Sequence, residues 1–89
     1  MVRYLVIFSG QVQGVGFRYI TLQLARQYGI TGTIKNRYDE KVEAVFQGDK
    51  NKIMAIINEL QNDSLIIIED YSIKQLELIE NEKSFLIIG

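Results

Sequence analysis

The segment from Gly10 to Arg18 carries residue types from which a protein can build a binding loop for phosphate. It reads Gly-Gln-Val-Gln-Gly-Val-Gly-Phe-Arg and lies between an apolar run, Tyr4 to Phe8, and apolar residues spaced by 3, 4 and 4 positions over residues 17–28. The run predicts a strand and the spacing predicts a helix, so the glycines lie in a strand-to-helix turn. Such a turn directs free backbone N–H groups and the positive end of a helix dipole toward one point. Glycine allows close approach and positive φ, and Arg18 adds a planar, permanent cation. The segment therefore predicts an anion site that suits phosphate.

Each of these features also has a purely structural explanation when it is taken alone. Glycine-rich turns join strands to helices in many proteins that bind nothing there. A helix arginine is most often a surface ion-pair partner, and Asn36, at the end of a predicted strand, would ordinarily be a turn residue. The prediction of a site therefore rests on the combination of these residues.

The composition limits both the size of the protein and its chemistry. A chain of 89 residues is long enough for one small domain, so we expect a single domain over residues 1–89. It has neither Cys nor His, which excludes phosphocysteine and phosphohistidine intermediates and disfavours soft metal sites. The absence of Cys makes a reducing cytoplasm the default expectation. We expect no signal peptide and no membrane span, because every apolar run is short.

The net charge of −1 is unevenly distributed along the chain. Residues 1–41 hold six basic and two acidic side chains, whereas residues 42–89 hold four basic and nine acidic ones. The glycine-rich segment lies in the basic half, as an anion site would favour. Chance also produces such an asymmetry in small proteins, so it is supporting evidence only.

The remaining pattern predicts strands and helices in the order βαββαβ. In the first half we expect a strand at 2–9, a helix at 17–28 ended by Gly29, and strands at 32–37 and 42–46 joined by a turn at 38–41. A second helix should follow the N-cap Asp49. The last part of the chain should form one interrupted strand or two over 65–68 and 71–78, and a short pairing segment at 85–88. This order predicts an α+β, ferredoxin-like two-layer sandwich, in which two helices pack on one face of an antiparallel sheet. The fold hosts enzymes, RNA binders and sensors, so the site must decide the function.

In these motifs the chain resembles the acylphosphatases over more than half of its length. The resemblance covers the segment Gly10–Arg18, then Ala25, the segment Gly32-Thr33-Ile34-Lys35-Asn36, and Val42-Glu43. The run Gln-Gly-Val-Gly-Phe-Arg is long and specific, and its coincidence with an Asn at the end of the second strand makes chance agreement improbable.

The resemblance implies a fold, an activity and a role for each matching residue. It implies that Arg18 binds phosphate together with the N–H groups of a cradle, and that Asn36 orients the attacking water. The cradle consists of Gln13, Gly14, Val15, Gly16 and Phe17. The implied reaction is hydrolysis of a carboxyl-phosphate to a carboxylate and inorganic phosphate, with no metal or cofactor. The implied partners are a small acyl phosphate and inorganic phosphate, without nucleic acid or membrane, and the simplest expectation is a monomeric protein.

Three positions depart from the family's pattern. Glu40 stands where the family usually has Gly in the turn after the second strand, so we expect that turn to be reshaped. Thr33 stands where the family often has Trp. Asn62-Asp63-Ser64 replaces a Gly-Pro stop, and the chain has no Pro at all. Arg18 and Asn36 are unaffected by these departures.

Two other function classes compete with the enzyme. An RNA recognition motif shares the element order, but it needs stacking aromatics on its central strands and a basic-Gly-aromatic run on its third strand. That strand here reads Lys-Val-Glu-Ala-Val-Phe and has no such run. A catalytically idle anion-binding or regulatory domain would keep the loop without turnover. Among the neighbouring residues, we expect Lys35 and Arg37 to be solvated charges on the face opposite Asn36. We expect Tyr19 to pack or to support the loop rather than to do chemistry, and Phe17 to belong to the core.

Overall fold

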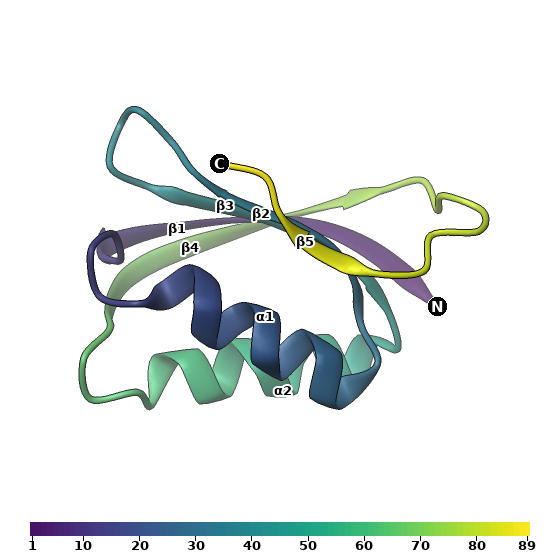
Figure 1. Cartoon of the computed structure of the whole chain (residues 1–89), viewed down its shortest axis with the longest axis horizontal. Helices are drawn as coiled ribbons and strands as arrows, with labels where there is room; N and C mark the ends of the chain where they lie inside the picture. Colours follow the sequence, from purple (N-terminus) through teal and green to yellow (C-terminus); the bar gives the residue numbers. More distant parts are fainter.

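The structure is a computed structural model that describes residues 1–89 as one five-stranded sheet covered by two helices (Figure 1). The strands are β1 (Val2–Gln11), β2 (Thr31–Asn36), β3 (Val42–Gly48), β4 (Ile67–Leu76) and β5 (Phe85–Ile87), and the helices are α1 (Phe17–Tyr28) and α2 (Lys50–Gln61). Both helices lack the length and apolar character that a bilayer-spanning helix requires.

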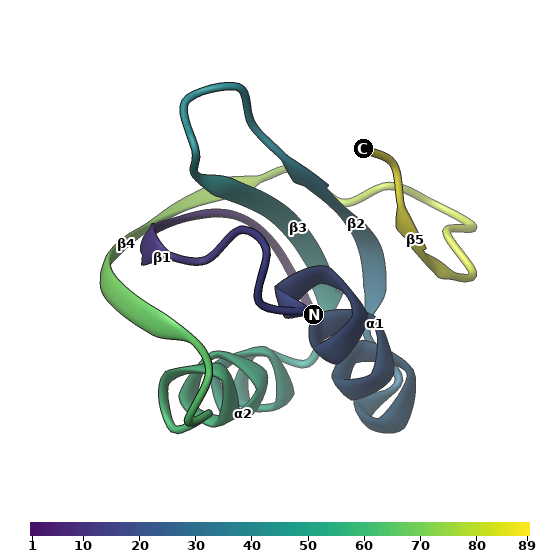
Figure 2. The same ribbon diagram turned by 60° about the vertical axis from the view of Figure 1, so that its left-hand side comes forward.

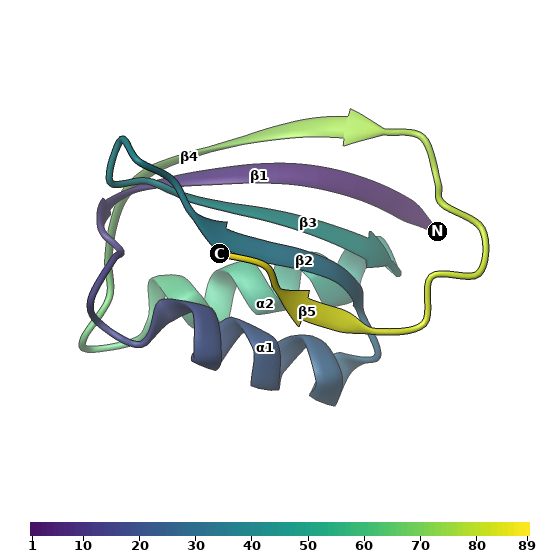
Figure 3. The same cartoon turned by 45° about the horizontal axis from the view of Figure 1, so that its top comes forward.

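The sheet has the order β4-β1-β3-β2-β5, which can be followed from one edge to the other in Figure 3. The pairs β4–β1, β1–β3 and β3–β2 are antiparallel, and β5 adds a short parallel strand beside β2. Seen nearly along the helices, α1 and α2 lie side by side on one face of the sheet (Figure 2). This arrangement confirms the ferredoxin-like α+β fold predicted from the element order.

The core forms where the sheet meets the helices, because the strands alternate in burial. Tyr4, Val6 and Phe8 of β1 are buried, whereas the residues between them are partly exposed on the open face. Phe8 meets Phe17 of α1 with ring centroids 5.0 Å apart, a contact that fixes the first turn of α1 against the sheet. Phe17 is therefore a core residue, as predicted.

Strand β4 resolves the ambiguity between one interrupted strand and two. Residues 67–76 form one strand whose register against β1 shifts between Ser9 and Gly10. Asp70 pairs with Ser9 and Ile68 pairs with Gly10, so Glu69 is the extra residue of a β-bulge. The bulge inverts the alternation of side chains, which is why the sequence pattern looked interrupted.

Both helices begin and end with local signals that the sequence contains. Gly29 follows α1 with a left-handed backbone, and the side chain of Asp49 accepts hydrogen bonds from the N–H groups of Asn51 and Lys52 at the start of α2. After α2, the carboxylate of Asp63 accepts from the N–H of Leu65 at 2.8 Å. A hydrogen-bonded turn at Asp63 thus begins the connection from α2 to β4.

Glu40 keeps the left-handed backbone that the turn between β2 and β3 requires. Its φ is +69°, so the turn retains the glycine-type conformation and is not reshaped as expected from the sequence. A non-glycine residue in this conformation costs about 1 kcal/mol. We therefore expect Glu40→Gly to raise the free energy of unfolding by about 1 kcal/mol, measured by urea denaturation.

Asn81 provides the matched control for this substitution, because it also has a positive φ, +64°. Asparagine tolerates the left-handed region better than glutamate, so Asn81→Gly should stabilise the protein less than Glu40→Gly. A Glu40→Gly variant less stable than the wild type would contradict the assignment of strain to this turn.

Candidate active site

The loop between β1 and α1 and the hairpin between β2 and β3 project from the same end of the sheet (Figures 1 and 3). A hollow of about 240 Å³ lies between this loop, the first turn of α1 and the end of β2. It is lined by Val12, Gly14, Gly16, Phe17, Arg18, Tyr19 and Asn36. The structure thus brings together the predicted phosphate-binding arginine, the predicted water-orienting asparagine and two of the predicted loop glycines.

The backbone of this loop offers a run of unused hydrogen-bond donors. No N–H group from Gln13 to Arg18 donates to another atom of the protein. Gly14 and Gly16 have φ values of +76° and +80°, although a Cβ at Gly14 would meet nothing within 4 Å. The glycines are therefore required by the backbone conformation and not by crowding. Successive free N–H groups that lead into a helix N-terminus form an anion-binding surface.

Arg18 lies at the second position of α1 and is half-buried beside this loop. Its Nη1 donates to the main-chain oxygen of Gly89 at 2.7 Å, and the side chain forms no ion pair. A guanidinium has five N–H donors, so most of the fork remains available to a ligand in the hollow.

Asn36, the last residue of β2, is held at the same oxygen atom. Its backbone N–H donates to the Gly89 main-chain oxygen at 2.9 Å, while its side-chain amide makes no hydrogen bond within the protein. Gly89 follows β5, which lies beside β2 (Figure 2). One acceptor therefore fixes the relative position of the arginine and the asparagine backbone, and the asparagine amide stays free.

Gln13 and Val15 lie on another side of the loop. Both line an adjacent hollow together with Gly10 and Glu40. The Nε2 of Gln13 donates to the main-chain oxygens of Arg37 and Lys41, at 2.8 and 2.9 Å. The structure thus places the side chain of Gln13 against the hairpin and leaves its backbone N–H in the loop.

The charges that flank Asn36 form ion pairs. Arg37 contacts Asp39 at 3.0 Å and Glu43 at 3.2 Å, and Lys35 contacts Glu43 at 3.8 Å. The hydrogen bonds from Arg37 hold the pKa of the Asp39 carboxyl below its ordinary value, and the same bonds raise the pKa of Arg37. Both shifts favour the charged forms, so the pair is intact at neutral pH, and Arg37 is a partly exposed charge engaged in ion pairs.

Two features of the site were not anticipated from the sequence. Tyr19 is 67% exposed and lines the hollow beside the loop, so it is not packed in the core. Gly89 reaches the site across 71 residues of sequence, and a contact over that separation leaves no local signal in the chain.

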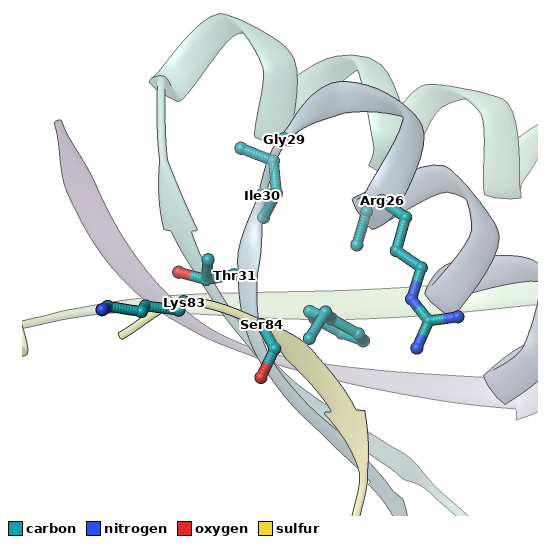
Figure 4. Close-up of a pocket in the computed structure, with 8 residues that line it drawn as sticks. Arg26, Gly29, Ile30, Thr31, Lys83 and Ser84 are labelled. Carbon is teal, nitrogen blue, oxygen red and sulfur yellow. The ribbon is translucent and has the colours of Figure 1, made fainter. Parts of the chain in front are cut away.

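A second hollow, of about 260 Å³, lies at the other end of α1 (Figure 4). Its lining includes Arg26, Lys83 and Ser84. The side chains of Arg26 and Lys83 extend in different directions in Figure 4 and do not converge on one point. We therefore place the candidate active site in the glycine loop.

The fold and the loop together define a small ferredoxin-like domain whose glycine loop offers unused backbone donors beside an arginine. The family model described as Acylphosphatase matches residues 4–87 of the chain. The acylphosphatase of Clostridium acetobutylicum is 40% identical over 89 residues, which cover 99% of this chain and 98% of the relative.

Two solved structures agree with this match. The crystal structure of the acylphosphatase from Bacillus subtilis superposes with a TM-score of 0.91 at 31% identity, over 100% of both chains. An acylphosphatase from Coxiella burnetii gives a TM-score of 0.86 at 26% identity, over 98% of this chain and 92% of that one. The chain belongs to the acylphosphatase family and is an enzyme of the hydrolase class.

Proposed function

We propose that this enzyme hydrolyses the carboxyl-phosphate bond of acyl phosphates with Arg18 and Asn36 as its catalytic residues. The observation that carries the proposal is the run of unused N–H groups from Gln13 to Arg18, beside an arginine with free donors. These groups would bind the equatorial oxygens of the phosphate, together with bidentate contacts from Arg18. Gln13, Gly14, Val15, Gly16 and Phe17 would contribute through their backbone.

The amide of Asn36 supplies the second half of the proposed mechanism. Its oxygen can accept a hydrogen bond from a water molecule while its nitrogen donates to the phosphate. A water held in this way would be placed for in-line attack on phosphorus, and positioning of this kind supplies much of the rate of phosphoryl transfer. The free amide of Asn36, in the same hollow as Arg18, supports this role.

The chemistry of the leaving group fits a site without histidine. An acyl phosphate releases a carboxylate, whose conjugate acid has a pKa of about 4, so the reaction needs little help from a general acid. Phosphoryl transfer also gains little from a strong base, because bond formation to the nucleophile is late in a loose transition state. Arginine, asparagine and backbone N–H groups are therefore sufficient for this reaction.

The proposal also covers the setting of the enzyme. We infer that residues 1–89 act as a single acylphosphatase-like domain, as a monomer in the cytoplasm, without a nucleic-acid partner or a cofactor. The lack of cysteine supports a reducing compartment. The pI of about 5.3 argues against a polyanion such as RNA.

The direct test is hydrolysis of benzoyl phosphate by the purified protein with EDTA present. We expect steady turnover that EDTA does not reduce, because no step in the proposed mechanism uses a metal. Failure of the folded protein to turn over benzoyl phosphate or acetyl phosphate would favour an idle anion-binding domain. A shift in electrophoretic mobility on addition of RNA that weakens with salt would instead favour the RNA-binding alternative.

A further inference from the structure

We propose that Gln13 is a positioning residue whose side chain couples the phosphate-binding loop to the hairpin that carries Asn36. The inference deepens the proposed function and rests on it. It gives the Gln13 side chain a role other than direct contact with phosphate. The role follows from the partners that this side chain has in the structure.

Both hydrogens of the Gln13 amide are engaged by the base of the β2–β3 hairpin. Nε2 donates to the main-chain oxygen of Arg37 at 2.8 Å and to that of Lys41 at 2.9 Å. A neutral amide nitrogen has two N–H donors and no more, so none remains for a phosphate oxygen. The side chain therefore acts on the hairpin.

The two acceptors of Gln13 are the residues that close the hairpin. The N–H of Arg37 donates to the main-chain oxygen of Lys41 at 2.8 Å. This bond closes the hairpin immediately after the end of β2. Asn36 immediately precedes Arg37. Because the Gln13 amide bonds to both residues of this closing pair, it fixes the position of the backbone that directly follows Asn36.

Gln13 makes the only hydrogen bonds between the loop and the hairpin. The backbone of residues 12–16 forms no hydrogen bond to residues 37–41. The ladder between β1 and β3 reaches only as far as the pair Phe8 and Val42. Without the Gln13 amide, the segment that would hold the phosphate and the segment that would hold the water have no polar connection on this side.

Such a connection matters for the rate because the attacking water must be held in line with phosphorus. A misplacement of about 1 Å can lower a rate by about 10²-fold. Loss of the Gln13 amide should therefore reduce the positioning of water more than the binding of phosphate, which the loop and Arg18 retain.

The test compares Gln13→Ala with Gln47→Ala in steady-state kinetics, with inorganic phosphate as competitive inhibitor. Gln47 is a matched control: its side chain is buried, donates to the oxygen of Ile79 at 2.9 Å and accepts from the N–H of Ile79 at 2.8 Å, away from the loop. We expect Gln13→Ala to lower kcat by about tenfold to 100-fold and to change the inhibition constant of phosphate by less than about threefold. Gln47→Ala should lower stability but leave kcat of the folded protein unchanged.

A double-mutant cycle with Asn36→Ala separates coupling from general loosening. If Gln13 acts by positioning the asparagine, Gln13→Ala should cost little further activity once the asparagine amide is gone. Equal losses in both backgrounds would overturn the proposal. So would a loss of phosphate affinity as large as the loss of kcat, which would make Gln13 a phosphate ligand.

Hydrogen exchange of the Arg37 N–H tests the coupling without any turnover. Gln13→Ala should speed this exchange more than Gln47→Ala does, because only the first substitution removes a bond to the hairpin closure. Unchanged exchange would contradict the coupling even in an active enzyme. Faster exchange in the Gln13→Ala variant of a protein that lacks turnover would support the coupling and refute the proposed function.

Discussion

Replacing Arg18 with alanine is expected to lower kcat/KM for benzoyl phosphate by about 10³-fold or more, the range found when an arginine that stabilises phosphoryl transfer is removed. The guanidinium is the one cation in the hollow, and only one of its N–H donors is engaged, by the Gly89 oxygen. Its loss removes charge that is needed both for the bound phosphate and for the transition state. Ground-state binding should therefore fall together with the rate.

The substitution Arg18→Lys should retain little of this activity. Lysine keeps the charge but loses the planar fork that binds two phosphate oxygens at once. It also cannot hold the Gly89 oxygen and a phosphate oxygen in the geometry of a guanidinium. An Arg18→Lys variant with nearly the activity of the wild type would show that charge alone matters.

A thermal shift with inorganic phosphate provides a second readout for Arg18. Phosphate at about ten times its Kd should stabilise the wild type by about 1.4 kcal/mol through mass action, and Arg18→Ala should remove most of the resulting rise in Tm. Arg26→Ala is the matched control, since Arg26 lies on the same helix, lines the other hollow and forms no ion pair. If both variants lose the phosphate response equally, the glycine loop is not the phosphate site.

Most of the fold was predictable because its signals are local. The alternation of β1, the helical spacing of α1 with Gly29 at its end, and the Asp49 N-cap each depend on residues close together in sequence. β4 was less clear because the bulge at Glu69 depends on its pairing with β1. The parallel pairing of β5 with β2 likewise depends on partners far apart in the chain.

The candidate site shows the same division between local and distant information. The glycine loop and Arg18 could be found because the motif is continuous and its chemistry is specific. Asn36 could be connected to it only through the family resemblance, since nothing local shows which loop its side chain faces. The Gly89 contact and the hairpin contacts of Gln13 span 71, 24 and 28 residues. Their partners are main-chain oxygens, which every residue has, so no residue type marks them.

Asn36→Ala is expected to lower kcat by about 10²-fold or more while phosphate inhibits as in the wild type to within about threefold. The reason is that different groups in the hollow would hold the phosphate and the water. The N–H groups of the loop and Arg18 would make most of the phosphate contacts, whereas the asparagine amide, which is free of protein partners, would orient the water and add a single hydrogen bond to the phosphate. Its removal leaves the phosphate contacts of the loop and Arg18 intact and the nucleophile unplaced.

Asn58→Ala is the matched control for this prediction, because Asn58 is exposed on α2 and takes no part in the hollow. It should retain the kcat of the wild type. An Asn36→Ala variant whose phosphate affinity collapses along with kcat would assign the asparagine to phosphate binding.

Aspartate at position 36 separates the two roles further. A carboxylate can still accept a hydrogen bond from water, but unlike alanine it adds a like charge beside the anion. Asn36→Asp should therefore weaken phosphate inhibition as well as turnover, whereas Asn36→Ala should lower turnover and change phosphate inhibition by less than about threefold.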